Sequence, residues 1–283
     1  MAKQKPRPKN PRKTSPHRRP RKNFPIKAGF RAGDSPPLKS DGELDSQEPM
    51  RLNRFIAHSG ICGRREADTL IERGEIAVNG KVVKELGTKV IPGIDKVIYK
   101  GKEIYPEKKV YVLYNKPKNE ITTLKDPKGR PTVMDVMKRA TDERIFPVGR
   151  LDRNTTGLLL FTNDGDLAKK LTHPSHKVRK VYKVKLNKPV DPEHLDLLQA
   201  GIELEDGLAK VDKISYVDGT ENRQIGLEIH IGKNRVVRRM FENLGYQVLS
   251  LDRTMLGHLT KKNLPRGKWR FLKEKEIAFL KMT

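Results

Sequence analysis

Hydrophobic residues follow a helical spacing in the first patterned part of the chain, from about residue 50 to residue 105. Two such groups are Leu52, Phe55 and Ile56, and then Ala67, Leu70 and Ile71. Gly60 and Gly63 separate the groups, and Gly74 ends the second one. Residues 76–83 then read as two short strands around an Asn-Gly pair, which is typical of a hairpin. The pattern predicts a small unit of two short helices followed by a hairpin.

A different pattern begins near residue 108. Apolar runs that predict strands lie at residues 110–115, 158–162, 178–186, 208–217, 224–231 and 248–253. Segments with helical spacing lie at residues 164–171, 191–199 and about 235–244. Because these elements do not alternate strictly as strand, helix and strand, we expect an α+β domain. Its sheet is expected to be mixed, largely antiparallel and flanked by helices.

Residues 1–48 show neither pattern. The first 33 residues contain many Lys and Arg, no Asp or Glu, and recurrent Pro. Such a segment cannot bury enough apolar surface to offset the entropy of ordering it. We therefore predict a disordered basic tail at 1–48, a small unit at 49–106 and a larger domain at 107–283. The tail either attracts phosphate groups without specificity or serves only solubility, and its composition leaves both open.

Charge and composition narrow the class of partner. The chain has 60 Lys and Arg against 35 Asp and Glu, a formal net charge of +25, which favours nucleic acid or another polyanion. No apolar run approaches the roughly 20 residues of a spanning helix, so a cytoplasmic protein without membrane contact is expected. The single cysteine, Cys62, excludes an intrachain disulfide, and the scattered histidines predict no metal site. Neither a P-loop nor a dinucleotide motif is present, so no cofactor is expected.

A single carboxylate in the larger domain invites a chemical interpretation. Asp152 lies between Arg150 and Arg153, shortly before the apolar run at 158–162. Neighbouring cations keep a carboxylate ionised, as a nucleophile requires. An Asp in this setting also caps turns or forms surface ion pairs. The local residues leave both interpretations open.

Two further segments carry chemically useful side chains. Tyr182 lies in the basic strand at 178–186, and Arg238 lies on a helical segment whose other face is apolar. A tyrosine in a strand is most often a core residue with a satisfied hydroxyl group. An arginine-rich helix most often presents a solvated or phosphate-binding face. Neither segment defines a site by itself.

The small unit resembles the RNA-binding S4 domain, which is named after the fourth small-subunit ribosomal protein. The resemblance rests on residues 51–57, Gly60, residues 64–67 and residues 74–80. It implies RNA contact through arginines of this unit, namely Arg51, Arg54, Arg64, Arg65 and Arg73. The family usually has Ser where Gly63 stands, and glycine caps the following helix less well.

The larger domain resembles the pseudouridine synthases of the RsuA and RluB branch, which modify ribosomal RNA. Residues 149–152 and 155–159 carry that family's signature, and the resemblance extends from about residue 50 to residue 280. It implies that Asp152 is the catalytic aspartate, Tyr182 the active-site tyrosine and Arg238 the basic partner of the aspartate.

The same resemblance implies the surroundings of the site. Leu251 would form a wall of the uracil pocket, and Arg150 would lie beside that pocket. The arginines expected to hold the RNA backbone are Arg153, Arg235 and Arg239. The family commonly has Gln where Val236 stands, so one polar contact near the site is in doubt.

Two functions from different classes remain after this step. The first is the isomerisation of a uridine in ribosomal RNA, preferably of the large subunit, by a monomer that needs no cofactor and flips the uridine out. The second is a non-catalytic RNA-binding or ribosome-assembly protein. The set of Asp152, Tyr182 and Arg238 favours the first, because a non-catalytic protein has no chemical reason to keep a carboxylate, which repels phosphate, in an RNA-binding cleft.

Overall fold

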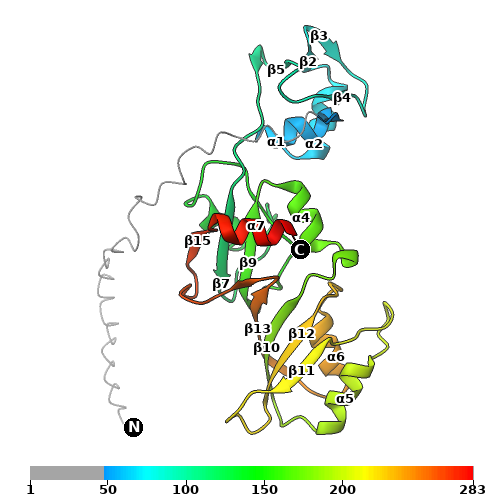
Figure 1. Cartoon of the computed structure of the whole chain (residues 1–283), viewed down its shortest axis with the longest axis vertical. Coiled ribbons are helices and arrows are strands. Elements are labelled where there is room, and N and C mark those ends of the chain that lie inside the picture. The colour runs from blue at the N-terminus through cyan, green and yellow to red at the C-terminus, as the bar shows by residue number, and fades with distance from the viewer. Residues whose placement is uncertain (1–47, 283) are drawn as a thin grey trace, which may run out of the picture. The chain divides into compact units, whose positions relative to one another are not determined.

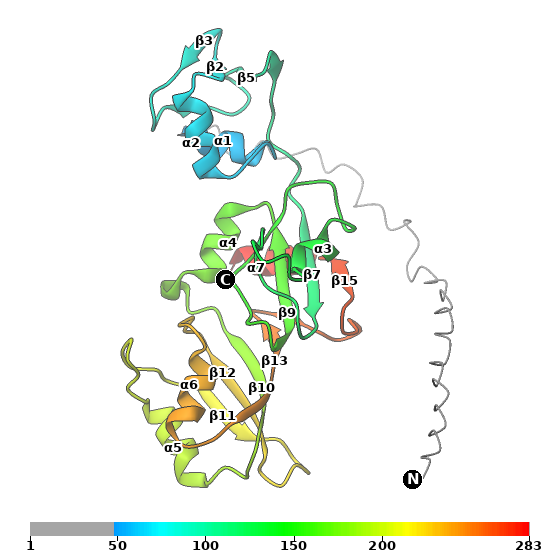
Figure 2. The same ribbon diagram turned by 180° about the vertical axis from the view of Figure 1, so that it is seen from behind.

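The computed structural model describes residues 48–282 of the chain (Figure 1 and Figure 2). The predicted tail at residues 1–48 lies outside these residues, apart from Glu48. Among the described residues, no helix combines the length and the apolar character needed to cross a membrane. The described chain contains a small N-terminal sheet unit and a larger sheet domain, each with its own hydrophobic core.

The small unit has the two helices and the hairpin that the sequence predicts. Its elements are β1 (Met50–Arg51), α1 (Leu52–His58), α2 (Arg64–Glu72), β2 (Ile76–Val78), β3 (Lys81–Val83), β4 (Lys89–Val90), β5 (Val97–Tyr99) and β6 (Lys102–Glu103). Asn79 and Gly80 both have positive φ, 49° and 80°, as the tight turn between β2 and β3 requires. Leu52, Phe55 and Ile56 of α1 are buried against Ala67 and other residues of this unit.

The larger domain is built on a nine-stranded sheet. Its strands are β7 (Tyr111–Lys116), β8 (Phe146–Pro147), β9 (Thr155–Thr162), β10 (Lys180–Leu186), β11 (Lys213–Tyr216), β12 (Gln224–Ile229), β13 (Val248–Leu256), β14 (Leu259–Thr260) and β15 (Trp269–Phe271). The main path runs β11-β12-β10-β13-β9-β7-β15, and β8 and β14 pair at its side. Only the β13–β9 pair is parallel, so the predicted α+β domain with a largely antiparallel sheet is confirmed.

Helices cover the two faces of this sheet unequally. One face carries the larger core, which includes residues of α3 (Val133–Met137), α5 (Pro192–Ala200) and α6 (Val236–Asn243). The other face carries a second core with residues of α4 (Gly165–Thr172) and α7 (Glu274–Met282), packed on β7 and β9. Figure 1 shows α7 in front of the sheet, and Figure 2 shows α3 on the opposite side. We call these the α6 face and the α7 face.

The alternation of side chains along β10 separates these faces. Tyr182, Val184 and Leu186 are buried in the core of the α6 face, whereas Lys183 and Lys185 are exposed on the other face. The interleaved apolar and basic residues in this strand thus encode one buried and one solvated side.

One glycine of the signature is required by close packing between strands. Gly157 has φ 107°, and a Cβ atom there would lie 2.2 Å from the carbonyl oxygen of Arg253. Any larger residue would push β9 away from β13, which is its parallel neighbour. Gly157 therefore allows β9, the strand that follows Asp152, to lie close to β13.

Three predicted strand boundaries differ from the structure by three residues or more. The strand expected at 208–217 is wrong in length, because β11 covers only Lys213–Tyr216. Leu208 is exposed and Ala209 forms an isolated bridge with Ile202, so the apolar run begins in a loop. In contrast, β9 begins earlier than expected, at Thr155, and β13 continues to Leu256.

Candidate active site

Asp152 lies in a turn that leads directly into β9. The backbone N–H of Thr155 donates to the carbonyl of Asp152 at 3.0 Å, which closes this turn. Leu151 before it and Thr155 after it are buried, while the Asp152 side chain is 37 % exposed. Thr122 holds the preceding residue, because its hydroxyl donates to the Leu151 carbonyl at 2.8 Å. The carboxylate thus reaches solvent from a backbone that is anchored on both sides.

A buried lysine binds the backbone of the same turn. Lys116, the last residue of β7, is completely inaccessible to solvent. Its ammonium group donates to the carbonyl oxygens of Thr155 at 2.9 Å, Asp152 at 3.1 Å and Arg153 at 3.3 Å. A fourth carbonyl, that of Pro117, lies at 3.0 Å. Because an unpaired buried cation is very costly, these contacts tie the position of the turn to the position of the ammonium group.

Lys116 is a residue that the sequence interpretation missed. The strand predicted at 110–115 stops one residue before Lys116, whereas β7 includes this lysine and buries it. Burial lowers the pKa of Lys116 to about 8, although the carboxylates of Glu120 and Asp152 oppose this shift. The only signal in the sequence is a charged residue at the end of an otherwise buried run, directly before a proline.

Arg238 approaches Asp152 from α6. Its Nε atom lies 4.0 Å from Oδ2 of Asp152, and its side chain is only 10 % exposed. The Nη1 atom donates to the carbonyl of Val248 at 3.0 Å, which orients the guanidinium group. The buried Nε atom has no hydrogen-bond partner, so a donor directed at the site is left available. Burial, reinforced by Arg235, lowers the pKa of Arg238, and Asp152 opposes that shift.

Arg150 is placed differently from Arg238. It is adjacent in sequence to the Asp152 turn, yet it is exposed. Within residues 48–282, the ion pair of Asp152 is made with Arg238 and not with Arg150. The fold thus brings together Asp152 and Arg238, which are 86 positions apart in the chain, and leaves the neighbouring Arg150 exposed to solvent.

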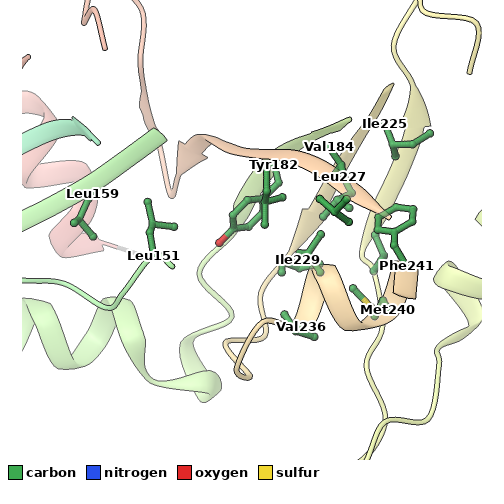
Figure 3. Close-up of a cluster of buried hydrophobic side chains, with 14 of the residues drawn as sticks. Leu151, Leu159, Tyr182, Val184, Ile225, Leu227, Ile229, Val236, Met240 and Phe241 are labelled. Atoms are coloured by element: carbon green, nitrogen blue, oxygen red, sulfur yellow. The ribbon is translucent and has the colours of Figure 1, made fainter. Parts of the chain in front are cut away.

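Tyr182 and Leu251 lie on the same buried face as Leu151. On β10 and β13, Val184 pairs with Leu251 and Tyr182 pairs with Arg253, so Tyr182 and Leu251 are diagonal neighbours. Figure 3 shows the Tyr182 hydroxyl directed away from Phe241 and toward the side on which Leu151 lies. The structure therefore brings Tyr182 and the Asp152 turn to one end of the larger core.

Arg235, directly before α6, and Arg239 within it already have carboxylate partners. Arg239 forms a bidentate pair with Asp206 at 3.0 and 2.9 Å, and Arg235 lies 3.2 Å from Glu242. Val236, the first residue of the helix, is buried in the core. The predicted division of this helix into an apolar and a charged side agrees with its buried residues, although Arg238 is buried as well. The RNA-binding role of Arg235 and Arg239 remains a prediction, as does that of the exposed Arg153.

Three of the five arginines singled out in the small unit lie around one hollow. This hollow has a volume of about 310 Å³ and is lined by Pro49, Met50, Arg51, Asn53, Arg54, Arg64 and Lys89. Arg65 and Arg73 are exposed elsewhere on the unit. The arrangement concentrates positive charge where β1, β4 and the two helices meet.

Comparison with known families identifies the class of protein that this fold and site define. Residues 50–93 match the S4 domain, and residues 110–243 match the RNA pseudouridylate synthase family. A crystal structure of a pseudouridylate synthase superposes with a TM-score of 0.58 at 28 % identity, covering 82 % of this chain and 99 % of that one. The class is an RNA-modifying isomerase with an S4 domain.

Relatives place the chain more narrowly within that class. It is 42 % identical over 234 residues to the ribosomal large subunit pseudouridine synthase B of Bacillus subtilis, covering 82 % of this chain and 95 % of that protein. An uncharacterised RNA pseudouridine synthase of Aquifex aeolicus is also 42 % identical, with 82 % and 93 % covered. The chain belongs to the RNA pseudouridine synthases, in the RsuA and RluB branch.

Proposed function

We propose that this enzyme converts a uridine of large-subunit ribosomal RNA to pseudouridine, with Asp152 as its catalytic carboxylate. The observation that carries the proposal is the Asp152–Arg238 pair of 4.0 Å, at the end of the core that contains Tyr182. The choice of RNA is supported by relatives that are named ribosomal large subunit pseudouridine synthase B.

The reaction is an isomerisation, so the product has the same atomic composition as uridine. The bond between N1 of the base and C1′ of the ribose breaks, the base turns, and C5 bonds to C1′. The proton on C5 then leaves, and N1 gains a proton. Asp152 has two roles available: it adds to C1′, as a carboxylate does in retaining glycosidases, or it removes a ribose proton. Both schemes need an ionised carboxylate at the sugar.

The neighbouring side chains have distinct proposed roles. Arg238 aims the Asp152 carboxylate and stabilises its charge, because a guanidinium in a poorly solvated site interacts strongly with an anion. Tyr182 stacks on the uracil ring and accepts the C5 proton directly or through water. Leu251 closes one side of the pocket, and Arg150 holds RNA at its rim. Since N1 and C1′ are hidden in stacked RNA, the target nucleotide must be flipped out.

Pseudouridine mapping tests this proposal. Ribosomal RNA transcripts incubated with the purified protein should gain pseudouridine at a defined uridine, and transcripts of the large subunit should be the ones modified. The proposal for the RNA fails if only small-subunit transcripts react. The proposal for catalysis fails if the protein binds either RNA tightly and no uridine changes, which is the outcome expected of a non-catalytic assembly protein.

A further inference from the structure

Part of the α7 face of the nine-stranded sheet carries polar side chains instead of a hydrophobic core. The second core covers β7 and β9 from Leu158 onward, together with α4 and α7. Polar residues replace this core at the start of β9 and on the strands β13, β10 and β12, which come next in the sheet. They are Thr156, Ser250, Asp252, Lys183 and Gln224. Strand register places these residues side by side, since Asp252 pairs with both Thr156 and Lys183.

These residues line a hollow on this face. Its volume is about 440 Å³, and Lys118 and Arg266 complete its lining. Three of the lining side chains are cationic and one is anionic. Lys118 and Lys183 are exposed, and neither forms an ion pair within residues 48–282. The hollow therefore presents positive charge that the described chain does not neutralise.

The single carboxylate of the hollow is already neutralised. Asp252 accepts hydrogen bonds from Thr156 at 2.6 Å and Arg266 at 2.8 Å, and it also pairs with Lys261. Burial alone would raise the pKa of Asp252, but these three hydrogen bonds lower it below its usual value. A second anion placed in the hollow thus meets the unpaired charges of Lys118 and Lys183 and not a free carboxylate.

The hollow is connected to the Asp152 turn through short covalent and hydrogen-bonded links. Thr156 is four residues after Asp152, so their backbones are within about 14 Å. Asn119, next to Lys118, donates its N–H to the carbonyl of Arg153 at 2.9 Å. A strand of RNA that leaves the Asp152 site can therefore reach the hollow around the end of β9 within a few nucleotides.

We propose that this hollow binds backbone phosphates of the RNA that flanks the target uridine, through Lys118 and Lys183. Arg266 and Lys261 complete the positive field, while Ser250 and Gln224 offer neutral hydrogen-bonding groups. The proposal rests on the proposed function only for the identity of the polyanion. It extends RNA contact from the α6 face, where the site lies, to the opposite face of the same sheet.

The double variant Lys118→Gln/Lys183→Gln tests the surface. Its affinity for the RNA substrate should fall about tenfold at low salt, and the slope of log affinity against log salt should fall by about 2. In single-turnover kinetics, the RNA concentration needed for half-maximal rate should rise, while the rate at saturating RNA should equal that of the wild type. The matched control, Lys210→Gln/Lys275→Gln, removes the same charge from two exposed lysines outside the hollow.

The outcomes separate this proposal from the proposed function. Equal losses of RNA affinity in both double variants would show a general charge effect and overturn the proposal. Wild-type affinity and salt slope in the Lys118/Lys183 variant would also overturn it, while pseudouridine formation by the wild type would still support the function. Reduced binding to vesicles rich in phosphatidylserine, with unchanged RNA affinity, would assign the surface to membranes and overturn the proposal as well.

Discussion

The two faces of the nine-stranded sheet use charge in opposite ways. On the α6 face, the Arg238 side chain is buried beside Asp152, so its charge acts on that carboxylate with little screening by solvent. On the α7 face, Lys183 and Lys118 stand in solvent, where salt screens their field. Under the two proposals above, this basic chain uses buried charge for chemistry and exposed charge for binding. Changes on the α6 face should affect the rate of the bound complex, and changes on the α7 face its formation.

The largest effect is expected from Asp152→Asn. This variant keeps the shape of the side chain and removes the charge, so it should lower kcat by about 10⁴-fold or more. RNA affinity should stay within a fewfold of wild type, because the turn is anchored through its backbone. Single-turnover pseudouridine formation and filter binding measure the two quantities. Asp218→Asn, in an exposed loop, is the matched control. Wild-type turnover in Asp152→Asn would remove the chemical distinction between the faces.

The second largest effect is expected from Lys116→Met, which keeps the length of a fully buried side chain and deletes its ammonium group. The carbonyls of Asp152, Arg153 and Thr155 then lose a shared donor, and the turn is free to shift. A displacement of about 1 Å costs about 100-fold in rate, so kcat should fall by that order. Circular dichroism and the melting temperature report whether the variant folds. A well-folded variant with full activity would show that the turn needs no such anchor.

Lys116 also predicts a pH dependence of the wild-type rate. Its pKa is lowered by burial to about 8, so kcat should fall as pH rises through about 8 and the ammonium loses a proton. Unfolding does not explain such a fall. Between pH 8 and the usual lysine value, the unfolded chain binds more protons at this site, so this group makes folding more favourable as pH rises. The alkaline decline of kcat should be absent in Lys116→Met, and its persistence there would assign it to another group.

Arg238→Ala and Arg150→Ala form the next comparison, because one arginine is buried at the site and the other is exposed near it. Arg238→Ala should lower kcat by about 100-fold, since Asp152 loses the cation 4.0 Å away. Arg150→Ala should chiefly raise the RNA concentration needed for half-maximal rate, by about three- to tenfold. Steady-state kinetics at several RNA concentrations separate the two effects. The reverse order of kcat losses would mean that Arg150, and not Arg238, acts on the carboxylate.

The sequence predicted elements with strong periodicity and missed features that depend on distant contacts. Alternation in β10 placed Tyr182 in a strand that is buried on one side, and helical spacing located α6. Leu208 is apolar and yet exposed, because β11 begins only at Lys213 and Leu208 lies in the loop before it. Lys116 was missed because hydropathy assigns a lysine to solvent. Its burial is tolerable because three carbonyl groups of the distant Asp152 turn, together with the carbonyl of Pro117 next to it, accept from its ammonium group.

The pairing of side chains within the site could not be predicted from periodicity. Local sequence offered the neighbouring Arg150 and Arg153 as cations for Asp152, and only the family resemblance pointed to Arg238. The short separation of Arg238 and Asp152 comes from tertiary structure, since α6 packs on the sheet through Val237, Met240 and Phe241. Their roles in catalysis remain predictions that the variants above test. The hollow at Lys118 and Lys183 could not be read from periodicity either, because it depends on which half of a sheet face the helices leave open.

The smallest effect is expected from Val236→Gln, which restores the residue common in the family. Val236 is 6 % exposed and packs in the core, so an amide there loses apolar contact and lowers the free energy of unfolding by about 1 kcal/mol. Residues two positions apart on a helix do not face each other, so the amide should not reach Arg238, and kcat should change by less than threefold. Thermal unfolding and single-turnover kinetics measure both. A tenfold rise in kcat would instead mean that the amide completes the site, and that the α6 face of this chain lacks one of its polar contacts.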